Sequence, residues 1–188
     1  MKTIVIYSSK TGNTKKIAEA IASALPANTP CVSINEVPAD IDTYDLAFVG
    51  YWVDKGTANA EARQFMESLT VPQTAIFATL GAYPDSEHGQ QSLKNGCALI
   101  KTNVIDSFIC QGKVDPTLLA AMKKMFPNGN GPHKDTPERR ARLAEAAKHP
   151  NENDCANAIA FAKKVLSTFN NKPLEGKNKP CLTQFHTK

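Results

Sequence analysis

The sequence predicts an α/β protein with a doubly wound, five-stranded parallel sheet of strand order 2-1-3-4-5 and helices on both faces. Two observations predict it. Short apolar runs alternate with helix-like runs at intervals of roughly 30 residues, the spacing of right-handed β-α-β crossovers. Several of these runs are continuously apolar, as in strands buried on both faces. In this order the ligand crevice lies at the carboxyl ends of the strands, where strands 1 and 3 diverge.

The strands follow from the apolar runs, most of them rich in β-branched or aromatic residues, and each is followed by a polar or glycine-containing stretch. We expect strands at Lys2–Tyr7, Cys31–Ile34, Leu46–Gly50, Thr74–Thr79 and Val104–Gln111. The helices follow from apolar residues at helical spacing, such as Ile17, Ala18 and Ile21 in the first. We expect helices at Thr14–Leu25, Ala58–Leu69, Gln90–Lys101, Pro116–Met125 and Asn153–Phe169.

Residues 127–150 interrupt this alternation. Pro127–Pro132 alternates glycine, asparagine and proline and predicts a loop. Thr136 and Pro137 then have the pattern of a helix start, and the helix rich in arginine should end near Lys148. We therefore expect one domain over residues 1–170, with residues 127–150 as an extra loop and arginine-rich helix. Residues 171–188 are polar and are expected to form a flexible tail.

Composition excludes several functional classes. The 188 residues carry a net charge of +4, which is spread out rather than clustered with aromatic residues, so we expect no nucleic-acid binding. No apolar run approaches the ~20 residues of a membrane helix, and the N-terminus lacks a signal-peptide pattern, so we expect a cytoplasmic protein that does not bind membranes. We also expect a monomer. The five cysteines have no metal-ligand spacing. We assign no catalytic or metal-binding residue.

The segment Ser9–Thr14 carries the clearest functional signal. It lies directly between the first strand and the first helix. Unpaired N–H groups and the helix dipole make such a position an anion site, and Gly12 permits close backbone approach. The segment matches neither the nucleoside-triphosphate loop nor the dinucleotide fingerprint, and its hydroxyls suit a single phosphomonoester. An ordinary capped strand-turn-helix is the alternative.

This segment resembles the phosphate-binding loop of the flavodoxin family, Thr/Ser-x-Thr-Gly-x-Thr, through Ser9, Thr11, Gly12 and Thr14. The resemblance extends over about residues 1–126 in the order of its loops. It implies the flavodoxin-like fold and flavin mononucleotide (FMN) as cofactor. The chain departs from the family's strongly acidic character, because it is nearly neutral without its lysine-containing tail.

Two further loops are expected to contact the flavin ring. The first contains Trp52, the single tryptophan, which could stack on the ring or belong to the core. Gly56 would let a neighbouring peptide change orientation, as a loop peptide does in flavodoxins. The second contains Tyr83, a stacking residue or an ordinary turn tyrosine. The complete set of predicted cofactor contacts is Ser9, Lys10, Thr11, Gly12, Asn13, Thr14, Tyr51, Trp52, Val53, Asp54, Lys55, Gly56, Thr79, Leu80, Gly81 and Tyr83.

The favoured function is an FMN-binding electron carrier between redox partners. One alternative is an FMN-dependent NAD(P)H oxidoreductase that acts on a quinone or another small acceptor, and a second is a binding module without flavin. Residues 131–133, 136–142 and 148–150 also resemble the small flavodoxin-like proteins that accompany anaerobic flavin reductases, including those that reduce bilirubin. That likeness implies a protein redox partner, with a dedicated flavin reductase as the candidate.

Overall fold

The computed structural model describes residues 1–126 and 134–171. The strands are β1 (Thr3–Tyr7), β2 (Cys31–Ser33), β3 (Leu46–Asp54), β4 (Thr57–Ala58), β5 (Gln73–Leu80) and β6 (Asn103–Gln111). The helices are α1 (Asn13–Ser23), α2 (Ala60–Ser68), α3 (Glu87–Cys97), α4 (Pro116–Met125), α5 (Pro137–Ala146) and α6 (Glu152–Asn170), with short 3-10 turns η1 (Ile34–Glu36) and η2 (Ile41–Thr43). The sheet has the order β2-β1-β3-β5-β6, all parallel, and β4 pairs antiparallel with β3. The predicted fold class and strand order are confirmed.

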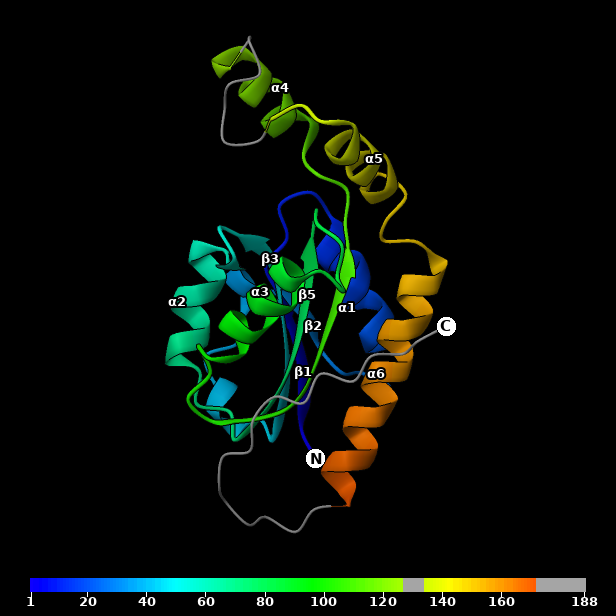
Figure 1. The fold of residues 1–188 in the computed structure, drawn as a ribbon. Helices are drawn as coiled ribbons and strands as arrows, with labels where there is room; N and C mark the ends of the chain where they lie inside the picture. Colours follow the sequence, from blue (N-terminus) through cyan, green and yellow to red (C-terminus); the bar gives the residue numbers. More distant parts are fainter. Residues whose placement is uncertain (127–133, 172–188) are drawn as a thin grey trace.

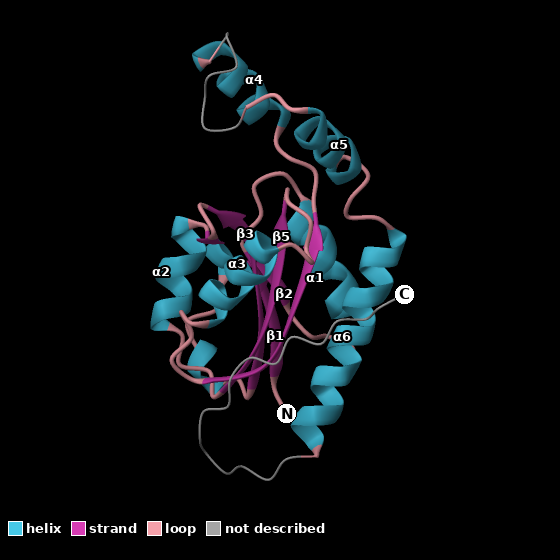
Figure 2. Ribbon diagram, in the orientation of Figure 1, coloured by secondary structure: helices cyan, strands magenta, loops and turns pink. Residues whose placement is uncertain are grey.

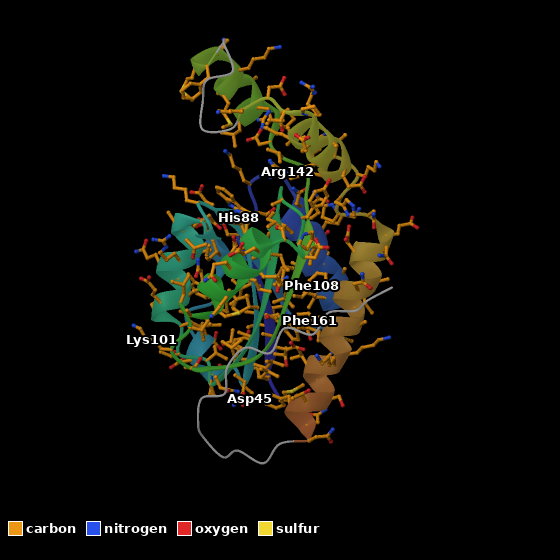
Figure 3. The ribbon with its side chains drawn as sticks, in the orientation of Figure 1. Asp45, His88, Lys101, Phe108, Arg142 and Phe161 are labelled. Atoms are coloured by element: carbon orange, nitrogen blue, oxygen red, sulfur yellow. The ribbon has the colours of Figure 1, made fainter. Side chains whose placement is uncertain are left out.

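Helices cover both faces of the sheet (Figures 1 and 2). On one face α1 and α6 bury Ile17, Ile21 and Val165 against the strands. The centroid of the Phe161 ring lies 6.0 Å from that of Phe48, which it meets edge-on, and 5.7 Å from that of Phe108, on which it stacks. Figure 3 shows Phe161 and Phe108 between α6 and the sheet. The opposite face packs α2 and α3 against the sheet. Each core layer removes large apolar side chains from water, which is the main stabilising contribution to the fold.

β3 continues four residues beyond its predicted end. Trp52 pairs with Thr79 of β5, so the hydrogen-bonding partner for this extension comes from a neighbouring strand. Lys55 (φ 49°) and Gly56 (φ 78°) then form a tight two-residue hairpin turn into β4. The segment 51–57, expected to be a loop, is therefore a strand end and a hairpin.

The start of α3 was also placed too late, at Gln90. Ser86 caps the helix by accepting a hydrogen bond from the Gly89 N–H at 3.1 Å, so the helix begins at Glu87. A serine three residues before a glycine is a weak signal in the sequence. The tight approach of Gly89 to the carbonyls of Tyr83 and Pro84 only becomes visible in the fold.

α4 and α5 agree with their predicted positions and stand off the end of the sheet where β1 leads into α1 (Figure 1). The predicted loop Pro127–Pro132 and the polar tail beyond Asn171 lie outside the described residues, so the predicted domain boundaries stay a prediction. Within residues 1–126 and 134–171, no helix combines the length and the apolar character needed to cross a bilayer.

Candidate functional site

The β1–α1 connection presents backbone N–H groups at the carboxyl edge of the sheet. Gly12 is the N-cap of α1 with φ 91°, and a Cβ at this position would meet nothing within 4 Å. The Ser9 hydroxyl accepts hydrogen bonds from the N–H groups of Gly12 and Lys15, both at 3.2 Å. No acidic residue lies in the first turn of α1. Open space, donor groups and the positive end of the helix dipole make this loop suitable for an anion.

Thr14 and Thr79 come together, but not as exposed ligands. Their hydroxyls lie 2.9 Å apart in a hydrogen bond, and the two residues are only 1% and 2% exposed. Each hydroxyl is thus a hydrogen-bond partner of the other inside the fold, and the cofactor contacts of Thr14 and Thr79 stay predictions. Asn13 donates from Nδ2 to the carbonyl of Lys113 at 2.8 Å, while Thr11 is exposed at the loop surface.

Strand alternation separates the residues at the end of β3. Tyr51 is fully buried, and its hydroxyl donates to the carbonyl of Ser92 at 3.2 Å, so its side chain offers no surface to a ligand. Val53 packs against the same core. Trp52 and Asp54 point to the other side, because successive strand residues alternate between faces. The side chains of Tyr51 and Val53 therefore face the core, and their contacts with the cofactor stay predictions.

A cavity of about 400 Å³ lies between the β1–α1 loop, the end of β3 and the start of α2. This volume is in the range of small-molecule and cofactor sites. Its lining residues are Ser8, Ser9, Lys10, Trp52, Asp54, Asn59, Ala60 and Glu61. Four of them, Ser9, Lys10, Trp52 and Asp54, were predicted as cofactor contacts. The fold thus joins the phosphate-type loop and the tryptophan in one cavity.

The other lining residues form a polar network that sequence reasoning missed. Ser8 donates from its hydroxyl to Glu61 Oε2 at 3.1 Å and accepts from Asn59 Nδ2 at 2.9 Å. Asn59 is 4% exposed, and its Oδ1 has no partner among the described residues. A buried acceptor without a partner is energetically costly. The only sequence signal was an asparagine directly before the first turn of α2.

Lys10 links the cavity to the segment after β6. Its Nζ lies 5.9 Å from the centroid of the Trp52 ring and 3.3 Å from Asp115 Oδ2. Asp115 caps α4, and its Oδ1 accepts hydrogen bonds from the N–H and hydroxyl of Thr117 at 2.8 Å and 2.6 Å. These bonds from Thr117, with the nearby Lys10 ammonium, lower the pKa of Asp115 from its usual value. Asp115 is thus an anion beside the cavity at neutral pH.

The loop after β5 lies apart from this cavity. Leu80 is buried, and Gly81 packs closely against Val114. Tyr83 is 41% exposed, and no residue of the 79–83 segment lines the cavity. The remaining predicted contacts, Lys55 and Gly56, form the hairpin turn, where the Gly56 carbonyl accepts a hydrogen bond from Asn95 Nδ2 at 2.8 Å. Residues from two of the three predicted loops line this cavity, and the contacts of the third loop stay predictions.

The thiols near the sheet are poorly suited to chemistry. Burial raises the pKa of Cys31 to about 11 and moves the pKa of Cys110 well above its usual value. Among the described residues, no cluster of histidine, cysteine and carboxylate side chains has the geometry of a metal site.

Comparisons with known proteins bear on the family and the fold. The family model described as flavodoxin domain matches residues 4–163. A flavodoxin-like domain-containing protein BilS from Clostridioides difficile (strain CD3) is 35% identical over 174 residues, covering 88% of this chain and 97% of the relative. A second BilS, from Clostridium symbiosum (strain WAL-14163), is 27% identical, covering 67% of this chain and 76% of the relative.

A solved structure of similar fold is a short-chain flavodoxin associated with a bacterial microcompartment. It shares 17% identity, covers 89% of this chain and 99% of its own, and superposes with a TM-score of 0.51. At this identity the likeness concerns the fold alone.

Proposed function

Because this chain belongs to the flavodoxin domain family, we propose that it binds FMN in the cavity beside Trp52 and exchanges electrons with another redox protein. One observation carries the proposal. The cavity of about 400 Å³ is lined by Ser9 and Lys10 of the loop that leads into α1 and by the aromatic residue Trp52. The phosphate and the flavin ring belong to one FMN molecule, so the loop before α1 and the Trp52 ring must lie within the length of that molecule.

The residues present fit FMN chemically. The N–H groups of Gly12 and Lys15, now bonded to the Ser9 hydroxyl, are donors for a phosphate at a helix N-terminus. Lys10 and Lys15 place positive charge at the same loop. Asn59 Oδ1, a buried acceptor without a partner among the described residues, suits a hydroxyl or N–H of the ligand. Trp52 supplies a flat ring for stacking.

The protein's contribution is binding, orientation and electrostatics, while bound FMN supplies one- and two-electron chemistry. Asp54 and Glu61 line the cavity together with Lys10. Two carboxylates near one ammonium disfavour negative charge on a reduced flavin ring beside Trp52. We expect this to make electron uptake less favourable and to lower the reduction potential. The partner that we propose is a protein, with a dedicated flavin reductase as the candidate.

The test begins with the visible spectrum and fluorescence of the full chain titrated with FMN. We expect quenching of flavin fluorescence on binding, and a spectrum that stays oxidised when NADH or NADPH is added without oxygen. Absence of quenching would contradict FMN binding. Rapid bleaching by one nucleotide alone would contradict the carrier and favour an NAD(P)H oxidoreductase.

Two aromatic variants locate the ring. Trp52→Ala should weaken FMN binding about thirtyfold, from about 1 kcal/mol of ring stacking and a similar amount of lost apolar burial. Tyr83→Ala is the matched control, because Tyr83 is exposed and does not line the cavity. Equal effects of the two substitutions would contradict placement of the ring at Trp52.

A further inference from the structure

Residues 113–126 and 134–148, here called the arm, carry α4 and α5 away from the body of the protein. Figure 1 shows both helices beyond the carboxyl end of the sheet. No residue of α4 is buried, and Ala146 is the single buried residue of α5. The arm therefore contributes little to the core. Its described part is surface that the rest of the described chain does not cover.

One face of α4 is apolar. Leu118, Met122 and Met125 are spaced i, i+4 and i+7, so they lie in one stripe, which Phe126 extends. Leu118, Met125 and Phe126 are 46%, 65% and 38% exposed. A ten-residue helix is marginal in water without packing, so its stability depends on something that covers this stripe. Exposed apolar surface of this kind is typical of an interaction site.

The arm is also basic, whereas the body is not. It contains eight lysine and arginine residues against four aspartate and glutamate residues, a net charge of +4, while the rest of the chain up to Asn171 has ten basic and thirteen acidic residues, a net charge of −3. Lys123 and Lys124 lie in the last turn of α4. Neither takes part in an ion pair with another described residue. Their charges are therefore available to a partner.

Both ends of the arm are attached to the loop and helix that form the proposed phosphate site. Lys10 pairs with Asp115 at 3.3 Å, and the Asn13 side chain donates to the Lys113 carbonyl at 2.8 Å. Two residues beyond the other end, the Pro150 carbonyl accepts a hydrogen bond from Lys16 Nζ at 2.7 Å. A molecule that docks on the arm is thus held at the end of the sheet where the cavity lies. Electron transfer requires this position, because the path between the bound flavin and the partner must be short.

We propose that the arm is the docking surface for a protein redox partner whose contact face is an apolar patch with an acidic rim. The inference rests on the proposed electron-carrier function and names the surface that this function uses. Charge complementarity selects the acidic partner, and the stripe of α4 fits an apolar groove at helical spacing. Complexes for electron transfer are small and transient, which suits a two-helix surface.

The test uses the full chain loaded with FMN and two probe proteins, an acidic [2Fe–2S] ferredoxin and the basic cytochrome c. We expect the ferredoxin to bind at low ionic strength, to weaken with salt and to cross-link to Lys123 or Lys124 with a carbodiimide, while cytochrome c binds more weakly. The double variant Lys123→Glu/Lys124→Glu should weaken ferredoxin binding about tenfold. The matched control, Lys94→Glu/Lys101→Glu, makes the same change in net charge away from the arm and should change binding less than about twofold; Figure 3 shows Lys101 at the opposite end of the molecule.

Leu118→Ser/Met125→Ser tests the apolar stripe and should weaken binding at high salt as well, with an unchanged far-ultraviolet spectrum. Equal weakening by the two lysine pairs, or no binding of the ferredoxin, would overturn the proposal. Sedimentation equilibrium gives a further test. A dimer of the full chain that is absent in the Leu118→Ser/Met125→Ser variant would also overturn the proposal, since a second copy of the chain would then cover the apolar stripe of α4. The quenching of flavin fluorescence by the protein is measured separately. If quenching is absent but the ferredoxin still binds, only the proposal of FMN binding is contradicted. If quenching is present but the ferredoxin does not bind, only the proposal that the arm is a docking surface is contradicted.

Discussion

Gly50→Ala should destabilise the strand that carries Trp52 to the cavity. Gly50 lies opposite Phe77 in the β3–β5 pairing, and an added Cβ would sit 2.1 Å from Cε2 and Cζ of the buried Phe77 ring. Relieving such an overlap costs about 3 kcal/mol, and the lower backbone entropy of alanine in the unfolded chain offsets up to about 1 kcal/mol. We therefore expect a loss of about 2 kcal/mol in the free energy of unfolding.

Urea unfolding followed by far-ultraviolet circular dichroism measures this loss, and a double-mutant cycle with Phe77→Leu tests its cause. The smaller leucine makes room for the methyl group, so the double variant should be more stable than the sum of the single effects by at least about 1 kcal/mol. Gly12→Ala is the control: its Cβ meets nothing within 4 Å, so its cost of about 1–2 kcal/mol comes from φ 91° and Phe77→Leu should not relieve it. Additive effects of Gly50→Ala and Phe77→Leu would refute the steric argument.

Three further predictions concern a helix cap, a thiol and a turn. Asn151→Ala removes the acceptor for the Asp154 N–H at 3.1 Å in the capping box of α6 and should cost about 1 kcal/mol, measured as a decrease of about 2–4 °C in Tm; an unchanged Tm would contradict it. Cys31 should react with iodoacetamide about tenfold more slowly at pH 8 in the native than in the unfolded protein, because a pKa of about 11 leaves little of the thiol as thiolate. A more basic thiolate is also a better nucleophile, but this compensates for the smaller thiolate fraction only in part. Peptide mass spectrometry should show the native rate still rising above pH 10, and a plateau near pH 9 would be inconsistent with the raised pKa. Gly56→Ala should cost about 1 kcal/mol through φ 78° alone, since its nearest neighbour would be His88 Cε1 at 3.8 Å, and Gly56→Asn should cost less in the same denaturation assay; equal costs would exclude the backbone explanation.

The predicted strand order and the β1–α1 loop depended on information that is local in the sequence. The alternation of apolar runs with helical runs permits few topologies, and the structure adopts the expected one. Likewise, Gly12 lies at φ 91° because the chain reverses from a strand into a helix within a few residues. Local geometry of this kind is encoded by residues that are neighbours in the chain, so the sequence alone predicts it.

The identity of the cavity wall depended on contacts between distant segments. Ser8 meets Glu61 and Asn59, more than 50 residues away, and no local pattern predicts that these side chains share one network. Pairing of Trp52 with Thr79 extended β3, and the extension then placed Tyr51 in the core and Trp52 at the cavity. These outcomes follow from strand register, which a single segment cannot determine.

The sequence by itself therefore determined the doubly wound fold, the turn from β1 into α1 and the helices of the arm, because periodicity, caps and glycine conformation act over a few residues. Only the tertiary structure decided which aromatic residue lines the cavity, that Thr14 and Thr79 satisfy each other, and that α4 and α5 stand off the body with an apolar stripe uncovered. The physical reason is that burial and hydrogen-bond pairing depend on which segments meet in space.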